Sequence, residues 1–70
     1  MRLSKHDLEI IVMRINHLIG KDYVVDKLNG YYHVYSFSEA ENLIAGSLRE
    51  CYNYCIAFIA GIREAFKSEM

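Results

Sequence analysis

The sequence predicts a small α+β domain that comprises an N-terminal helix, a two-stranded antiparallel β-hairpin, a short helical turn and a long C-terminal helix. Three observations predict it. Apolar residues near both ends of the chain recur every three or four positions, which is the helical period. Between them lie two runs rich in β-branched and aromatic residues. These runs flank Asn29-Gly30, the dipeptide best suited to a tight hairpin turn.

The length and composition favour association with a second molecule. A chain of 70 residues forms a single domain, spanning 1–70. Chains of this size bury only about 60% of the surface that their unfolded forms expose, so their cores are small. Hydrophobic residues make up 53% of the sequence, which is above the usual apolar share of about 45–50%. We therefore expect surplus apolar surface that a partner covers.

The charge pattern argues against strong nucleic-acid binding and against a membrane span. Eight Lys and Arg residues against nine Asp and Glu leave a net charge of −1, with no excess of cations to neutralise phosphates. The longest apolar run without a charge, residues 54–62, is far shorter than the about 20 residues that cross a membrane. The two cysteines fit a reducing compartment. We expect a cytoplasmic protein without a cofactor.

The first helix is predicted to begin at Lys5 and to end at Ile19. Ser4 and Asp7 form a Ser-x-x-acid pattern, in which each side chain caps the backbone N–H of the other residue. Gly20 suits the left-handed conformation that ends many helices. Two further apolar residues widen the helix face beyond a single contact, and these are Ile10 and Met13.

The two β-rich runs, residues 23–28 and 31–37, are predicted to pair across a two-residue turn. This turn fixes the register, so that Asp26 faces His33, and alternate residues point to opposite faces. An Asp–His pair costs less near water than in a core, so its face should be exposed and the other face should pack on the helices. The face toward the helices holds Tyr23, Val25, Tyr32 and Val34, and the exposed face holds Val24, Asp26, Leu28, Tyr31, His33, Tyr35 and Phe37.

Two Ser-x-x-Glu patterns predict the elements of the second half of the chain. Ser38 and Glu41, followed by a glycine stop at Gly46, predict a short helical turn. Ser47 and Glu50 repeat the pattern at the start of the long helix, over 47–68. The apolar arc of that helix holds Leu48, Cys51, Tyr52, Cys55, Phe58, Ile59, Ile62 and Phe66.

The candidate binding surface is the exposed hairpin face. Tyrosine is enriched in the cores of protein interfaces, so contact with another protein is the first interpretation. The alternative is stacking of single-stranded bases on the same tyrosines, with Lys21 and Lys27 at the hairpin ends. A third possibility is that tyrosine is abundant only because it favours strands. The predicted binding residues are Tyr31, Tyr35, Phe37, His33 and Asp26.

The sequence predicts neither a metal site nor an enzyme. Cys51 and Cys55 lie one helical turn apart on the apolar arc, where free cysteines are usually buried structural thiols. The three histidines occupy other elements at spacings that match no metal motif. Asp26 and His33 could orient a nucleophile, but no strained nucleophile turn or phosphate-binding loop accompanies them.

Self-association is expected from the hairpin edges and from the long helix. A lone hairpin is unstable and leaves unpaired edges, so two hairpins that pair edge to edge in a homodimer would make a four-stranded sheet. Small residues occupy a sector of the long helix where charges are usual. A glycine there costs about 1 kcal/mol against alanine, which indicates close approach by the first helix or by a second subunit. This second surface comprises Tyr54, Ala57, Ala60 and Gly61.

Residues 23–62 resemble small uncharacterised proteins of phage and mobile-element gene clusters. The similar segments are the hairpin Gly30-Tyr31-Tyr32-His33-Val34-Tyr35 and the helix that starts with Ser-Leu-Arg-Glu-Cys-Tyr at Ser47 and reaches Gly61. Those proteins carry two glycines at the hairpin, where this chain has one. The resemblance implies no catalytic residues. We expect a homodimeric protein-interaction module, with a nucleic-acid-binding accessory protein as the alternative.

Overall fold

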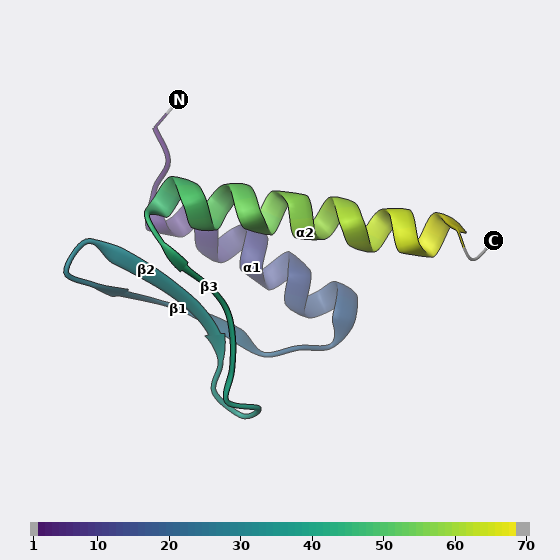
Figure 1. The fold of residues 1–70 in the computed structure, drawn as a ribbon, viewed down its shortest axis with the longest axis horizontal. Helices are drawn as coiled ribbons and strands as arrows, with labels where there is room; N and C mark the ends of the chain where they lie inside the picture. The colour runs from purple at the N-terminus through teal and green to yellow at the C-terminus, as the bar shows by residue number, and fades with distance from the viewer. Residues whose placement is uncertain (1, 69–70) are drawn as a thin grey trace.

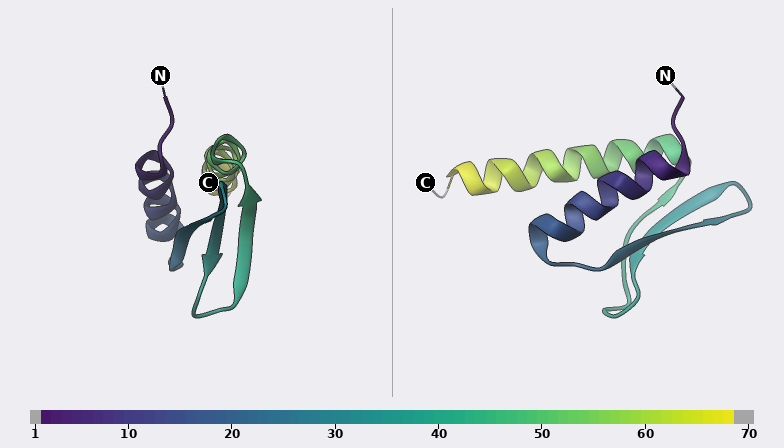
Figure 2. Two further views of the ribbon diagram at one scale, coloured as in Figure 1. Left: turned by 90° about the vertical axis from the view of Figure 1, so that its left-hand side faces the viewer. Right: turned by 180° about the vertical axis from the view of Figure 1, so that it is seen from behind.

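The computed structural model of the chain describes residues 2–68 and contains two helices and three strands. The strands form one antiparallel sheet in the order β1-β2-β3. Both helices pack on the same face of this sheet, and the C-terminal half of α2 extends past it (Figures 1 and 2). The elements are α1 (Lys5–Ile19), β1 (Tyr23–Leu28), β2 (Tyr31–Ser36), β3 (Glu41–Gly46) and α2 (Leu48–Ser68).

Helix α1 confirms the predicted boundaries and both predicted caps. The Ser4 hydroxyl accepts a hydrogen bond from the Asp7 N–H at 3.3 Å, and the Asp7 carboxylate accepts one from the Ser4 N–H at 2.9 Å. Gly20 ends the helix in the left-handed region at φ 66°, where glycine has no Cβ to clash. The helix therefore begins and ends where local chemistry directs it.

The hairpin of β1 and β2 confirms the predicted turn and register. Asn29 and Gly30 have φ values of 52° and 82°, as a two-residue turn with positive φ at both positions requires. Asp26 stands opposite His33, and Leu28 stands opposite Tyr31. The face toward the helices is the expected one, and its buried members are Tyr23, Tyr32, Val34 and Ser36.

The predicted short helical turn over residues 38–46 is wrong, because this segment contributes β3. Residues 37–40 form a tight turn, with Ala40 at φ 51°, and β3 then pairs with β2. Ser38 and Glu41 do not cap a helix, because their side chains bond to Asp22 and to Tyr23, at 2.5 and 2.6 Å. Pairing with the open edge of β2 and packing of Leu43 and Ile44 on the core outweigh the local capping pattern.

Helix α2 confirms the predicted cap and most of the predicted apolar arc. The Ser47 N–H donates to the Glu50 carboxylate at 2.9 Å, and the Glu50 N–H donates to the Ser47 hydroxyl at 3.1 Å. Only the end of the arc differs, since Phe66 lies beyond the sheet and is exposed. The buried hydrophobic core comprises Leu8, Val12, Ile15, Tyr23, Tyr32, Val34, Cys51, Cys55 and Ile59.

The molecule is thin in one direction, with Cα extents of 44 × 32 × 15 Å. Its longest dimension runs along α2, which continues past the sheet toward the C-terminus (Figure 1). Neither of the two described helices has the length and apolar character that a membrane crossing requires. The thin shape leaves one face of the sheet without a covering layer.

Candidate functional site

The face of the sheet opposite the helices is a broad exposed surface with large apolar side chains, and we call it the outer face. It contains the outward side chains of the three strands, and the alternation of β2 continues to the exposed Phe37 in the turn that follows. Phe37, Leu28 and Tyr31 are 82%, 75% and 67% exposed, respectively. Large side chains this exposed stabilise a monomer very little, and a group of them on one face is typical of an interaction site. The described outer face comprises Val24, Asp26, Leu28, Tyr31, His33, Tyr35, Phe37, Asn42 and Ala45.

A polar network lies in the middle of the outer face. The Tyr35 hydroxyl donates to the Asp26 carboxylate at 2.7 Å, and this hydrogen bond raises the pKa of the Tyr35 phenol. His33 Nε2 lies 2.9 Å from Asn42 Oδ1, and the His33 and Tyr35 rings stack with their centroids 4.8 Å apart. These contacts hold both rings in fixed orientations, which lowers the entropy cost of binding through them.

The expected direct pairing of the Asp26 and His33 side chains is not observed. The two residues are register partners, but the Asp26 carboxylate is hydrogen-bonded to Tyr35 and the His33 imidazole is hydrogen-bonded to Asn42. The sequence could not indicate this exchange of partners, because Asn42 belongs to the strand that was predicted as a helical turn. In this arrangement Asp26 does not orient the imidazole as it would in a nucleophile system.

A hollow of about 740 Å³ lies at the tip of the hairpin, at one end of the outer face. Leu28 and Tyr31 line it on one side, and His33 and Ala45 line it farther along the sheet. Lys27 borders the hollow, and its Nζ lies 5.5 Å from the centroid of the Tyr32 ring. The tip therefore presents an apolar depression with one carboxylate, Asp26, at its rim.

Lys21, one of the two hairpin lysines, is not free to receive phosphates. Lys21 Nζ lies 2.5 Å from Glu39 and 3.4 Å from Glu41, so two carboxylates offset its charge. The hydrogen bond to Glu39 is the main reason why the pKa of Lys21 is raised. Among the described outer-face residues, Asp26 is the only Asp, Glu, Lys or Arg. The surface is therefore apolar and slightly negative, which disfavours a polyanion.

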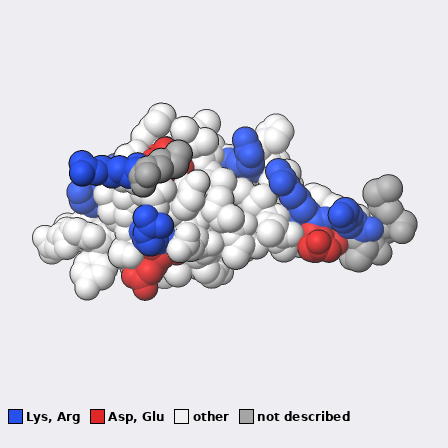
Figure 3. Space-filling model, turned by 90° about the horizontal axis from the view of Figure 1, so that it is seen from above, with Lys and Arg blue, Asp and Glu red and all other residues white. Residues whose placement is uncertain are grey.

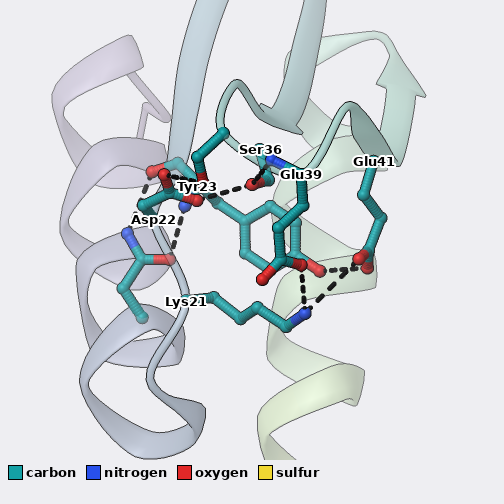
Figure 4. Close-up of polar contacts among 8 residues, drawn as sticks. Lys21, Asp22, Tyr23, Ser36, Glu39 and Glu41 are labelled. Atoms are coloured by element: carbon teal, nitrogen blue, oxygen red, sulfur yellow. Dashed lines mark hydrogen bonds and ion pairs between the residues drawn. The ribbon is translucent and has the colours of Figure 1, made fainter.

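A polar cluster at the other end of the sheet was not foreseen from the sequence (Figure 4). The Tyr23 hydroxyl donates to Glu41 at 2.6 Å, and the Ser36 and Ser38 hydroxyls both donate to Asp22 at 2.5 Å. The cluster joins the segment after α1 to the turn between β2 and β3. The hairpin register brings Ser36 near Asp22, but Glu41 reaches Tyr23 only because β3 pairs with β2, so no local sequence pattern could have revealed that contact.

The cluster shifts the pKa values of its members in the directions expected for a stabilising network. Burial, followed by the hydrogen bond to Glu41, raises the pKa of Tyr23 to about 12. The hydrogen bond from Tyr23, aided by Lys21, lowers the pKa of Glu41. The serine hydroxyls lower the pKa of Asp22. Tyr23, Glu41 and Asp22 are thus each held in their ordinary ionisation state at neutral pH, which suits a structural clamp.

The two cysteines are free and buried, as predicted. Burial raises the pKa of both thiols, and that of Cys55 rises to about 11. Reactive cysteines need a lowered pKa and access to solvent, so these thiols act as small apolar side chains of the core. Within residues 2–68, no cluster of three or more His, Cys, Asp and Glu side chains is placed to hold a metal ion.

The second predicted surface, on α2, is exposed along its whole length. Tyr54, Ala57, Ala60 and Gly61 all face solvent, and Tyr54 contacts Phe58 with ring centroids 6.2 Å apart. A Cβ added at Gly61 would meet nothing within 4 Å, so no neighbour in the described chain approaches it closely. Seen from above, uncharged side chains fill the middle of the surface between groups of charged ones (Figure 3). A role of these four residues in an interface stays a prediction.

Comparison of the chain with family models, curated proteins and solved structures finds no significant match. The resemblance to phage and mobile-element proteins therefore stays a prediction. The functional argument depends on the chemistry of the surfaces described above.

Proposed function

We propose that the chain is a small protein-interaction module that acts as a homodimer and binds another protein through its outer face. The observation that carries the proposal is the exposure of Leu28, Tyr31 and Phe37 on one side of a sheet whose other face packs against the helices. A partner can bury this apolar surface while the core of the chain stays packed as it is.

The chemistry of the outer face defines the partner. Aromatic side chains with two fixed rings suit an apolar protein surface, since Tyr is enriched in interface cores. Asp26 adds a carboxylate near the centre, so a Lys or Arg on the partner completes the contact. The same carboxylate and the pairing of Lys21 with two glutamates argue against the nucleic-acid alternative. The free buried thiols suit a reducing compartment, so we place the protein in the cytoplasm.

The test compares two double variants in a capture experiment from host extract. Tyr31→Ser with Phe37→Ser removes two exposed outer-face side chains, and Arg14→Ser with His17→Ser is a control on the exposed side of α1. Each protein captured by the parent is then purified and its affinity is measured by calorimetry.

We expect a directly binding protein whose affinity falls at least about tenfold in the outer-face variant, which is the loss of a modest hot spot, and not in the control. Equal affinities for the parent and the outer-face variant would contradict the proposal. Binding of an oligonucleotide with a steep salt dependence would instead favour the nucleic-acid alternative.

A further inference from the structure

Among the strands of residues 2–68, the outer edge of β1 is the one regular open edge of the sheet. β1 and β3 are the two edge strands. The ladder of β3 shifts register opposite Val34 and Tyr35, and such irregularities blunt an edge against pairing. β1 pairs with β2 over six consecutive residues without a shift. An added strand therefore fits β1 better than β3.

The Asn16 side chain shows which backbone groups of β1 face this edge. Its amide donates to the Tyr23 carbonyl at 2.9 Å and accepts from the Tyr23 N–H at 2.8 Å, in the manner of a neighbouring strand. Backbone groups alternate in direction along a strand, so those of Val25 and Lys27 point the same way as those of Tyr23. No side chain in the described part of the chain caps them. Val25 and Lys27 thus each offer an unpaired backbone N–H and C=O to an added strand.

A groove of about 390 Å³ runs beside this edge, between β1 and α1. Ile10 and Met13 line it and are 48% and 68% exposed, so the apolar face of α1 extends beyond the core of one chain into this groove. Glu9 also lines the groove next to Val25, and it has no ion pair within residues 2–68. The groove is therefore mainly apolar, and the Glu9 carboxylate and the His6 imidazole are polar groups of its lining.

We propose that a second copy of this chain pairs with β1 along this edge, antiparallel and about a two-fold axis at Asp26, and forms a six-stranded sheet. This inference specifies the interface of the homodimer in the proposed function and rests on that proposal. The register follows from the free groups. Val25 and Lys27 of one copy exchange hydrogen bonds with Lys27 and Val25 of the other, while the capped Tyr23 stays outside the new ladder.

The same register makes the side chains complementary. Val24, which is 44% exposed, lies opposite Leu28 of the second copy, so both lose apolar area on the outer side. On the helix side, Lys27 of the second copy lies opposite Val25 and enters the groove beside Glu9 and Met13. The two-fold axis repeats each contact. The one unfavourable contact is Asp26 opposite Asp26 of the second copy, so Asp26→Asn should tighten the dimer roughly two- to five-fold.

A cysteine scan tests this register directly. Opposite residues of a non-hydrogen-bonded pair have Cα atoms about 4.5 Å apart, within the range of a disulfide. Under mild oxidation, Asp26→Cys should therefore give a covalent dimer. The matched control Val24→Cys should not, since its two copies lie about 14 Å apart in this register. The natural thiols are buried and do not interfere, and far-UV circular dichroism checks that both variants fold.

A charge exchange read by sedimentation equilibrium provides the second arm. Glu9→Lys should weaken the dimer about five- to tenfold by opposing Lys27, and Glu9→Lys with Lys27→Glu should restore it. A dimer that is insensitive to these changes and does not cross-link at position 26 would overturn the β1 edge while the proposed homodimer stands. A chain that is monomeric at all concentrations would overturn both, and binding through the outer face would still be read independently by the capture experiment.

Discussion

The two faces of the sheet contain similar residues and use them for different purposes. Tyr32 and Val34 are buried under the helices, while Tyr31 and Val24, on the other side of the same two strands, face solvent. Strand propensity alone cannot separate the two sets, since Tyr and Val favour strands on either face. The difference shows that the helices decide which side chains form the core and which are available for binding.

The largest expected effect on stability comes from placing a charge on each face of the sheet in turn. Val34→Asp buries an unpaired carboxylate at a fully buried position, which should cost roughly 4–5 kcal/mol or more and abolish cooperative unfolding. Val24→Asp, the same change on the outer face, should leave a folded chain. Thermal unfolding followed by circular dichroism distinguishes the two variants. Equal losses of stability would contradict the proposed difference between the two faces.

An intermediate effect is expected at Tyr23, whose ring is buried and whose hydroxyl reaches the clamp. Its pKa is raised to about 12 in the fold, so its contribution to stability is complete below the pKa of an unfolded tyrosine, about 10. That contribution is lost as the pH rises toward 12, when the phenol of the unfolded chain ionises first. Tyr23→Phe should remove the last step of the tyrosine absorbance titration and flatten the alkaline loss of stability. An unchanged last step would contradict the assignment.

A smaller effect is expected at the acidic end of the pH range. The pKa of Glu41 is lowered from 4.5 in the fold, so its contribution is present above that value and is lost as the pH falls through the lower folded pKa. Glu41→Gln should therefore be less stable than the parent at neutral pH, with a smaller difference at an acidic pH below 4.5, where protonation begins to remove the charge of Glu41. Urea unfolding at both pH values measures this. A constant difference between the two proteins would show that Glu41 does not act through its charge.

Local patterns in the sequence predicted much of the fold, and non-local pairing accounts for what they missed. Ser4 with Asp7 and Ser47 with Glu50 are capping pairs within one helical turn, and Asn29-Gly30 specifies its own turn. The Ser38–Glu41 pattern looks the same in the sequence, but partners distant in the chain engage both side chains. A capping pattern therefore predicts a helix only where no open strand edge competes for the same residues.

The candidate site followed the same division between local and non-local information. The alternation of the hairpin identified the outer face and its exposed Tyr31 and Phe37. The partners of Asp26 and His33 were missed because Tyr35 lies diagonally across the sheet from Asp26 and Asn42 comes from β3. The open edge of β1 also needed the structure, since only the position of Asn16 shows which backbone groups are free.

The most direct test of the central claim compares the neighbouring variants Tyr31→Ala and Tyr32→Ala by urea unfolding at one fixed protein concentration. Tyr31 is 67% exposed on the outer face and Tyr32 is 8% exposed on the inner face. The account predicts a change within about 0.5 kcal/mol for Tyr31→Ala and a loss of roughly 3–5 kcal/mol for Tyr32→Ala. Similar losses in the two variants would mean that the outer face also stabilises the fold, and would contradict its assignment as a surface kept for binding.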